Sequence, residues 1–402
     1  MANVSSSNGL EKRPKLRFPG FDEPYVLHRI GDIYAERSER GAADMELLSV
    51  TMNGGVMQRS EIEGKDNSSE DKSNYKVVRK GDMVYNSMRM WQGANGVSPY
   101  DGIVSPAYTV LTAKLPICNE YFAALFKNYK LINEFKKNSQ GMTSDTWNLK
   151  YPQIKTIKVY LPRVTEQEKV ASLLVTLDKR IAAQATLVEQ LKKYKRGVMQ
   201  RIFRNMSAVS PSGFETVQLS AIFKKVSRRN NKSEIKTVIT NSAEYGLIPQ
   251  RDFFDKDIAV DGNTSNYYVI EQGDFVYNPR KSNTAPYGPF NRYEREERGI
   301  ISPLYTCLVL QADIEPSYLA WYFKSDAWYR YIYDNGSQGV RHDRVSMTDG
   351  LLMGIPVIIP SKEAQLKIAK LLDCLESRFQ TELSQYESLK SIRVALLQQL
   401  FI

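Results

Sequence analysis

The chain has 402 residues, of which 42% are hydrophobic and 11% aromatic, and this is enough apolar material to exclude a largely disordered protein. Lys and Arg outnumber Asp and Glu by 55 to 45, and the resulting net charge of +10 favours a polyanionic partner, nucleic acid before membrane. There is no run of about 20 apolar residues, and the polar N-terminal stretch lacks the apolar core of a signal peptide. We therefore expect a cytoplasmic protein with no membrane partner.

Residues 1–20 are polar and predict a flexible arm whose last residues dock on the first domain. Residues 21–162 mix short β-type runs with one helical stretch near 120–135, and this mixture predicts an α+β domain. The β-type runs lie at 75–78, 83–85, 108–111 and 157–161. The segment 64–74 is rich in Ser, Asn, Asp and Lys and predicts a solvated loop.

Residues 163–204 contain no Pro, and their apolar residues alternate at spacings of three and four, which predicts one long helix. Thr165 and Glu168 have the spacing of a capping box at its start. Residues 205–213 carry the small residues, Pro and Gly of a linker. A second domain over 214–360 and a second long helix over 361–402 repeat this plan.

The two helices are an internal duplication at a constant offset, because 401 minus 203 and 365 minus 167 both give 198. Their shared seam predicts that the helices pack on each other or on equivalent partners. The seam residues are Leu174, Leu177, Ile181, Val188, Leu191, Val198 and Ile202 in the first helix, and Leu372, Leu375, Phe379, Tyr386, Leu389, Leu396 and Leu400 in the second. The alternative is that each stripe is the buried face of an ordinary helix.

The duplication extends into the domains. The Gly-Asp run at 81–86 returns at 273–278, Gly102–Pro106 returns as Gly299–Pro303, and Ser139-Gln140-Gly141 returns at 337–339. The segments 87–101 and 279–298, by contrast, differ in length and content. If both halves bind the same kind of polymer, these segments are where two different sequences would be distinguished; alternatively, they are surface loops that are free to vary.

With this layout, the sequence resembles the specificity subunit of type I restriction–modification systems over essentially the whole chain. The motifs that carry the resemblance are GDMVYNSMRMWQGANGVSPYDGIVSPAYTVL at 81–111, GDFVYNPRKSNTAPYGPF at 273–290, GIISPLYT at 299–306, and the helix starts EQEKVASLL and AQLKIAKLL.

The resemblance implies two target recognition domains, each reading one half of a bipartite site in double-stranded DNA. It also implies two long helices that pair as an antiparallel coiled coil, set the spacing and dock two DNA methyltransferase subunits. Restriction subunits that use ATP and Mg would join the complex. S-adenosylmethionine would be held by the methyltransferase, so this chain would carry no cofactor.

The sequence shows no Gly-rich dinucleotide loop, no phosphate-binding GKS or GKT loop and no Asn/Asp-Pro-Pro-aromatic methyltransferase motif. Its three cysteines and two histidines are too few and too scattered to predict a metal site, and the thiols are expected to be buried and free. We therefore expect a chain without catalysis of its own. The alternatives are a coiled-coil scaffold or adaptor that binds protein and not DNA, and an enzyme, a nuclease or methyltransferase, with an unrecognised site.

DNA contacts divide into base reading and phosphate binding. Arg suits guanine, and Asn or Gln suits adenine in the major groove. The base-reading candidates are Arg89, Gln92, Asn95, Thr143 and Ser144 in the first domain and Arg280, Lys281, Asn283, Arg341, His342 and Arg344 in the second. The phosphate candidates are Lys80, Lys136, Lys137, Lys224, Lys225, Arg228 and Arg229. For each of them the alternative is a solvated surface side chain.

Overall fold

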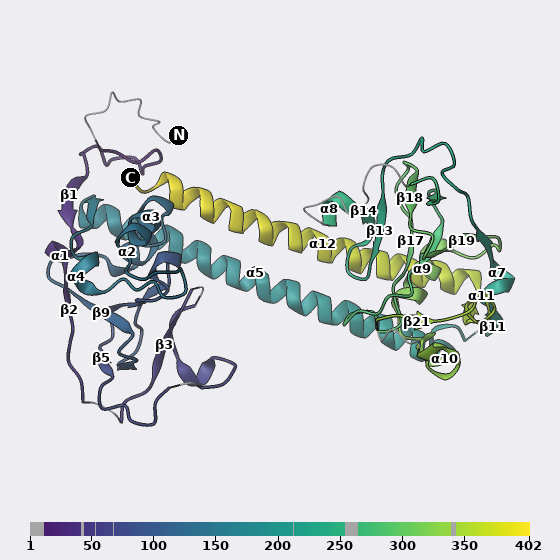
Figure 1. Ribbon diagram of the computed structural model, residues 1–402, viewed down its shortest axis with the longest axis horizontal. Helices are drawn as coiled ribbons and strands as arrows, with labels where there is room; N and C mark the ends of the chain where they lie inside the picture. Colours follow the sequence, from purple (N-terminus) through teal and green to yellow (C-terminus); the bar gives the residue numbers. More distant parts are fainter. Residues whose placement is uncertain are drawn as a thin grey trace. The chain divides into compact units, whose positions relative to one another are not determined.

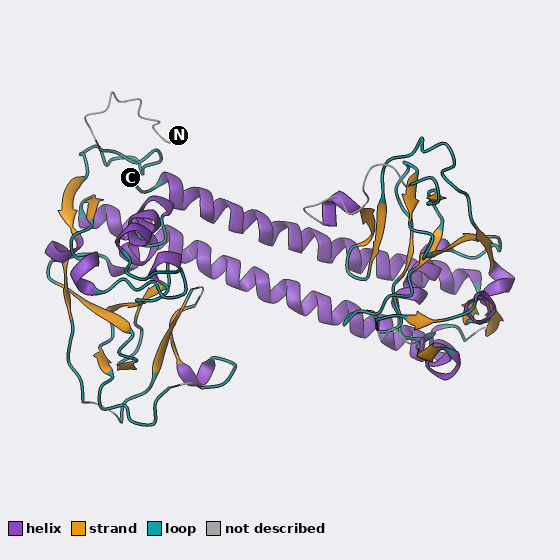
Figure 2. Ribbon diagram, viewed as in Figure 1, coloured by secondary structure: helices purple, strands orange, loops and turns teal. Residues whose placement is uncertain are grey.

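A computed structural model describes residues 12–41, 44–52, 54–66, 68–211, 213–253, 264–338 and 343–402. The chain folds into two compact units (Figures 1 and 2). Unit 1 comprises Met1–Thr186 together with Ser384–Ile402, and unit 2 comprises Leu187–Leu383. Each long helix therefore contributes one part to unit 1 and the other part to unit 2. Among the described residues, no helix has the length and apolar character needed to cross a membrane.

Unit 1 is an α+β fold built on a four-stranded antiparallel sheet in the order β2-β9-β6-β7, with the two-stranded pairs β1-β10, β3-β4 and β5-β8 beside it. The strands are β1 (Val26–Arg29), β2 (Tyr34–Glu36), β3 (Leu48–Thr51), β4 (Gly55–Gln58), β5 (Lys76–Val78), β6 (Met83–Asn86), β7 (Asn95–Val97), β8 (Gly102–Val104), β9 (Tyr108–Ala113) and β10 (Lys158–Leu161). The helices are α1 (Ile30–Ile33), α2 (Asn119–Leu125), α3 (Tyr129–Asn138) and α4 (Tyr151–Ile154), with 3-10 turns η1 (Arg59–Glu61) and η2 (Met90–Gln92).

Unit 2 repeats this topology. Its four-stranded sheet has the order β12-β19-β16-β17, accompanied by β11-β22, β13-β14, β15-β18 and β20-β21. The strands are β11 (Phe214–Gln218), β12 (Phe223–Val226), β13 (Ile239–Ser242), β14 (Gly246–Pro249), β15 (Tyr268–Ile270), β16 (Phe275–Tyr277), β17 (Phe290–Arg292), β18 (Gly299–Ile301), β19 (Thr306–Leu310), β20 (Ser337–Gln338), β21 (Val345–Ser346) and β22 (Pro356–Pro360). The helices are α6 (Met206–Val209), α7 (Leu219–Ile222), α8 (Gln250–Phe253), α9 (Pro316–Lys324), α10 (Tyr329–Asn335) and α11 (Asp349–Met353).

The two long helices are α5 (Val164–Arg204) and α12 (Lys362–Gln399), and in each unit their segments run side by side in opposite directions (Figure 1). In unit 1, Asp178 of α5 pairs with Arg393 of α12; in unit 2, Lys195 of α5 pairs with Glu376 of α12. Every predicted seam residue is buried or half-buried. The predicted α+β fold with antiparallel paired helices is thereby confirmed.

The helix ends belong to the cores of the two units. Leu174 near the start of α5 shares the unit 1 core with Leu400 and Phe401 at the end of the chain. Ile202 near the end of α5 shares the unit 2 core with Leu372 near the start of α12. The helices are therefore structural parts of both units, because their terminal turns supply apolar side chains to each core.

A buried glutamine ties the start of each long helix to its unit. The Gln167 side chain donates to the Pro162 carbonyl over 3.0 Å and accepts from the Cys118 N–H over 3.1 Å. Gln365 makes the equivalent bonds with Pro360 and with Glu315, each over 2.9 Å. The predicted capping box is wrong: α5 begins at Val164, so Thr165 already lies inside the helix.

The end of the N-terminal arm docks on unit 1, as predicted. The Leu16 N–H donates to the Gln399 carbonyl over 3.0 Å, and Arg17 donates to both carboxylate oxygens of Glu166 at 2.8 Å. Tyr25 adds a hydroxyl bond of 3.1 Å to the same carboxylate. Residues 1–11 of the predicted arm lie outside the described residues.

Three local expectations need correction. The helical stretch near 120–135 is two helices, because α2 ends at Leu125 and Asn128 then caps α3 by accepting from the Lys130 N–H. Residues 205–213 contain the short helix α6, with Met206 buried in the unit 2 core. Of the three thiols expected to be buried, Cys307 is buried, Cys118 is half-buried and Cys374 is exposed.

Candidate nucleic-acid interface

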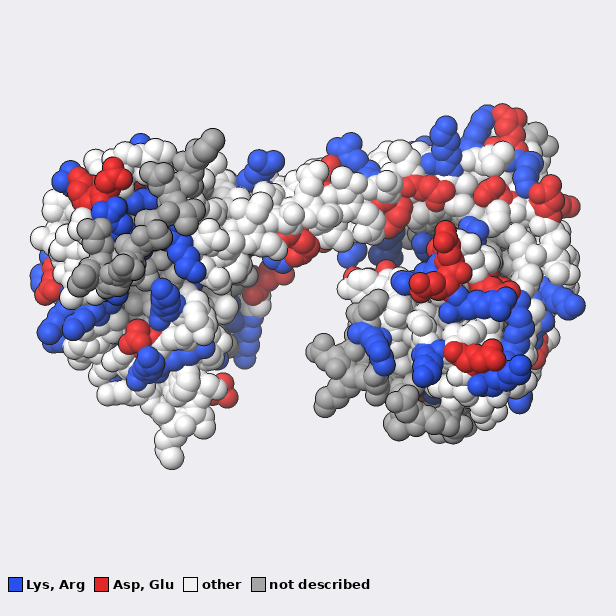
Figure 3. Space-filling model, turned by 90° about the horizontal axis from the view of Figure 1, so that it is seen from above, with Lys and Arg blue, Asp and Glu red and all other residues white. Residues whose placement is uncertain are grey.

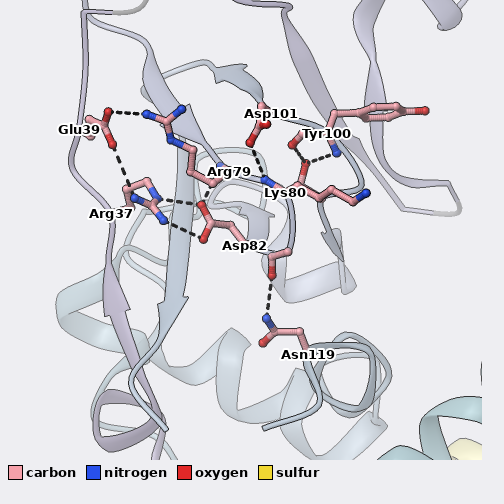
Figure 4. A network of polar contacts seen from close by, with 10 residues as sticks. Arg37, Glu39, Arg79, Lys80, Asp82, Tyr100, Asp101 and Asn119 are labelled. Carbon is pink, nitrogen blue, oxygen red and sulfur yellow. Dashed lines mark hydrogen bonds and ion pairs between the residues drawn. The ribbon is translucent and has the colours of Figure 1, made fainter. Parts of the chain in front are cut away.

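The carboxylate of the repeated Gly-Asp run fixes a turn in each unit. Asp82 is buried and accepts from Arg37 Nε over 2.8 Å, from Arg37 Nη2 over 3.1 Å and from the Arg79 N–H over 2.8 Å (Figure 4). In unit 2, Asp274 accepts from Arg228 and from the Glu271 N–H. These carboxylates are fully engaged in holding the β-turn before β6 and β16, so the run shapes the scaffold.

Exposed basic groups surround this turn in unit 1. Glu39 pairs with Arg79 at 3.0 Å and lies 3.6 Å from Arg37, while the Lys80 N–H donates to Asp101 over 2.9 Å. The ammonium group of Lys80 extends away from these partners (Figure 4). Lys80 therefore keeps a solvent-exposed charge that a phosphate group can approach.

In unit 1 the backbone brings the variable segment next to the second shared motif. The Leu149 N–H donates to the Ser87 carbonyl over 2.8 Å, which places the turn carrying Thr143 and Ser144 beside the start of segment 87–101. Thr143 and Ser144 are exposed, in a turn closed by the Thr146 hydroxyl. Arg89, on the variable segment, is also exposed.

Unit 2 brings the equivalent segments together by its own backbone bonds. The Val345 N–H donates to the Pro279 carbonyl, and the Lys281 N–H donates to the Asp343 carbonyl, each over 2.9 Å. Arg280 and Arg344 form an isolated antiparallel bridge. Arg280 and Asn283 are exposed, whereas the side chains of Lys281 and Arg344 are half-buried. Arg341 and His342 lie outside the described residues.

Asn95 is a wrong base-reading candidate. Its side chain is 0% exposed in β7 and donates to the Gly93 carbonyl over 3.0 Å, so a base edge cannot reach it. Gln92, its neighbour in segment 87–101, is half-buried at the end of η2.

Arg228 is half-buried, and its guanidinium pairs with Asp274 and lies 3.4 Å from Glu271, so it helps to hold the scaffold. All the phosphate candidates remain predictions. Lys137 pairs with Glu134 at 2.7 Å and Lys225 with Asp349 at 2.6 Å, in both cases at exposed positions. Lys136 lies over the Trp91 ring, and Lys224 and Arg229 are exposed. On the face shown in Figure 3, basic and acidic side chains are interspersed within each unit.

Two clefts were missed from the sequence. In unit 1 a cleft of about 510 Å³ is lined by Lys80, Lys127, Asp178 and Arg393, where the domain meets the helices. Burial lowers the pKa of Lys127, whose ammonium donates to the Met52 carbonyl over 3.2 Å. In unit 2 a cleft of about 470 Å³ lies beside Arg344 and is walled by Tyr268 and Tyr305. Tyr305 repeats Tyr108 at an offset of 197, and a comparison of the two halves could have singled it out.

The described residues contain no group of three or more His, Cys, Asp or Glu side chains that could hold a metal ion. Instead, the polar side chains that lie close together belong to exposed loops and to the turns that stabilise the scaffold. The fold thus defines an internally duplicated class of protein, in which two α+β units share two long antiparallel helices and present paired variable loops.

Comparisons with known proteins are consistent with this class. Residues 36–193 match the type I restriction modification DNA specificity domain. The chain is 25% identical over 147 residues to a Methanocaldococcus jannaschii protein named as the MjaX specificity subunit of a type I restriction enzyme, covering 35% of this chain and 34% of that protein. It is 29% identical over 130 residues to the type I restriction enzyme MjaVIII specificity subunit of the same organism, covering 32% and 29%.

These alignments span about a third of the length of the two relatives. The whole fold is shared with the crystal structure of a type I restriction–modification S subunit from M. genitalium, with a TM-score of 0.58, 15% identity, and coverage of 97% of this chain and 99% of that one. The chain is thus similar to type I restriction–modification specificity subunits, in sequence over residues 36–193 and in its fold.

Proposed function

We propose that this chain reads DNA for a type I restriction–modification complex, with each unit recognising one half of a bipartite duplex site. The observation that carries the proposal is that each unit joins its variable segment to its second shared motif through backbone hydrogen bonds, while the side chains displayed there differ. Arg89, Thr143 and Ser144 occupy this place in unit 1, and the exposed Arg280 and Asn283 occupy it in unit 2. One scaffold thus displays two reading surfaces.

The exposed arginines are the strongest base-reading candidates. A guanidinium can bind the O6 and N7 atoms of guanine in a bidentate manner in the major groove, and such a pair contributes about 1–3 kcal/mol of discrimination. Arg89 and Arg280 are both exposed on variable segments. Exposed lysines such as Lys80 and Lys224 would add affinity for phosphate groups, which carries no sequence information and falls as salt rises.

The helices would dock two DNA methyltransferase subunits, one on each unit. In unit 1 the helix pair exposes Leu173 by 37% and Ile392 by 49%, and in unit 2 it exposes Leu371 by 47% and Tyr194 by 61%. Leu173 and Leu371 are related by the offset of 198 found in the helices, and so are Tyr194 and Ile392. Large exposed apolar side chains at repeated positions fit two copies of one partner.

The chemistry would belong to the partners. S-adenosylmethionine would be bound by the methyltransferase, and ATP with Mg by restriction subunits, in the cytoplasm. The chain itself would contribute recognition and assembly without catalysis.

The test uses the chain co-expressed with its methyltransferase. The purified complex is expected to bind duplex DNA at low ionic strength and to lose affinity steeply as salt is raised. Intact assembly with no duplex binding at low salt would instead favour a protein scaffold. Methylation by the chain without the methyltransferase would favour an enzyme.

Half-site assignment is tested with a reciprocal pair of variants. Arg280→Ala is expected to weaken base discrimination in one half-site of the methylated sequence. Arg89→Ala is expected to weaken it in the other half-site, and each loss should be about 1–3 kcal/mol. Each variant is thus the matched control for its counterpart. Equal modification of all sites by both variants would contradict the assignment of these residues.

A further inference from the structure

The cleft in unit 2 combines aromatic walls with positive charge. Its lining includes Tyr268 of β15, Tyr305 just before β19, and the Arg344 and Lys225 side chains. The cleft has a volume of about 470 Å³, within the usual range for sites that hold a small molecule or one unit of a polymer. Leu304, which is exposed, stands at its edge.

The equivalent place in unit 1 holds an internal ion pair. The Lys76 ammonium binds the Glu36 carboxylate over 3.2 Å and the Tyr108 carbonyl over 2.8 Å, and Lys76 is 8% exposed. Its charge is thus neutralised within the fold, and the side chain is buried.

Strand register shows that the positions correspond. Glu36 pairs with Leu111 and Lys225 with Leu308, while Lys76 pairs with Val104 and Tyr268 with Ile301. Each of these partners differs by the same offset of 197, as do Tyr108 and Tyr305. Unit 2 has therefore replaced the acid by a lysine and the buried lysine by a tyrosine.

Each cation of the unit 2 cleft has one carboxylate near it, and in both pairs the carboxylate is exposed to solvent. Arg344 Nε is buried without a hydrogen-bond partner among the described residues, and its nearest carboxylate, Asp343, lies 3.7 Å away. Lys225 pairs with Asp349 at the solvent-exposed edge, where the pair contributes little to stability. Burial raises the pKa of Tyr305 while the nearby Arg280 and Arg344 lower it, so the hydroxyl remains protonated and can donate a hydrogen bond.

We propose that this cleft binds the sugar–phosphate backbone of one DNA strand at the half-site read by unit 2. Phosphate groups protrude from a duplex and can enter a concave surface, whereas base edges lie within the grooves and require a protruding reader. Arg344 and Lys225 donate to the phosphate oxygens, and the rings of Tyr268 and Tyr305 pack against the deoxyribose. This inference rests on the proposed function. It assigns this backbone-binding cleft, the clamp, to one half-site, because the equivalent lysine of unit 1 is buried and paired with Glu36.

The test uses the complex of the full chain with its methyltransferase, and duplexes in which single phosphates are replaced by neutral methylphosphonates. For the unaltered chain, one or two linkages in the unit 2 half-site are expected to be sensitive, with affinity falling about tenfold, or about 1.4 kcal/mol. In the double variant Lys225→Gln with Arg344→Gln, replacing the same phosphate by a methylphosphonate is expected to cause no further loss of affinity. In this double variant the affinity for DNA should also depend less steeply on salt, by the amount expected for the loss of about one to two phosphate contacts.

Arg330→Gln is the matched control, because it removes one exposed positive charge from helix α10 of the same unit. It should leave the methylphosphonate profile unchanged. Lys225→Gln alone, at an exposed position, provides a variant that keeps Arg344 and its packing.

The unaltered chain and both cleft variants could all bind and methylate DNA and be sensitive to methylphosphonates at the same phosphates. That result would overturn the clamp and leave the proposed function standing. Failure of the unaltered complex to bind any duplex would overturn the proposed function and the clamp together. Sensitive linkages at the equivalent phosphate of the unit 1 half-site would also contradict the clamp, because Lys76 is buried there and paired with Glu36.

Discussion

The guanidinium of Arg393 binds both carboxylate oxygens of Asp178, with Nη2 at 3.1 Å from Oδ2, and joins α12 to α5 in unit 1. Lys195 and Glu376 make the equivalent ion pair in unit 2. Asp178 and Glu376 are separated by 198 residues, and so are Lys195 and Arg393. The duplication is thus preserved in the chemistry that pairs the helices, with the acid and the base exchanged between α5 and α12.

Removal of the acid should loosen unit 1. Asp178→Asn leaves Arg393 without its partner beside the half-buried Lys127, and we expect a loss of about 1 kcal/mol in the free energy of unfolding. Denaturant unfolding of the chain measures this change in the free energy of unfolding. Glu387→Gln removes an exposed pair with Lys390 on the same helix and is expected to cost less than about 0.5 kcal/mol. Equal effects of the two substitutions would show that the interhelical pair has no special role.

The buried glutamines should be more sensitive. Gln167→Ala leaves the Cys118 N–H and the Pro162 carbonyl without partners, and we expect a loss of about 1–3 kcal/mol for the buried groups left unbonded. Hydrogen exchange at Cys118 reports the loss directly, since its N–H would lose protection. Gln190→Ala, at an exposed position of the same helix, is the control. Unchanged exchange at Cys118 in Gln167→Ala would contradict this role.

Seam positions should differ in their effect according to where they lie on the helix. Leu372 is fully buried in the unit 2 core, so Leu372→Ala is expected to destabilise that unit by about 2–5 kcal/mol. Leu191 is half-buried and lies away from that core, so Leu191→Ala should cost clearly less, while Leu191→Glu should abolish assembly with the methyltransferase and leave the units folded. Thermal unfolding and co-purification separate these outcomes. Unfolding of unit 2 by Leu191→Glu would refute the distinction.

The thiols provide a test of burial and of pH dependence. Burial raises the pKa of Cys307 to about 12, whereas Cys374 is exposed on α12. At pH 8 a maleimide reagent should label Cys374 rapidly and Cys307 only on unfolding. Since an unfolded thiol has a pKa of about 8.5, the stability from the buried neutral thiol is complete below that pH and is lost as pH rises toward 12. Equal labelling rates in the native chain would contradict the burial, and Cys307→Ser should remove the slow phase.

The sequence alone predicted the duplicated α+β plan, the helix seams and the β-type runs. Comparison of the two copies of the repeat shows which positions are shared by the scaffold and which vary. It could not place Asn95, because a polar residue in a variable segment gives no sign of which face it occupies. Asn95 is buried because β4 and β7 approach each other closely. A Cβ at Gly96 would lie 2.9 Å from the Gly55 Cα, and Asn95 is enclosed beside that contact. The structural role of Arg228 was also missed: it binds Asp274 as Arg37 binds Asp82, but the two arginines do not occupy equivalent strand positions.

The unit 2 cleft was beyond prediction for a different reason. Its lining converges from five separate parts of the chain, around Lys225, Tyr268, Tyr277, Tyr305 and Arg344, and no single stretch shows that these residues meet. The contrast with the ion pair of unit 1 appears only when strand register aligns Glu36 with Lys225.

The most direct measurement is a genome-wide map of adenine methylation in cells that express the neighbouring methyltransferase gene with and without the gene for this chain. The account predicts a bipartite motif with a fixed unspecified gap that is methylated only when this chain is present. Identical methylation in both cells, with the methyltransferase active, would contradict the claim that this chain selects the DNA sequence.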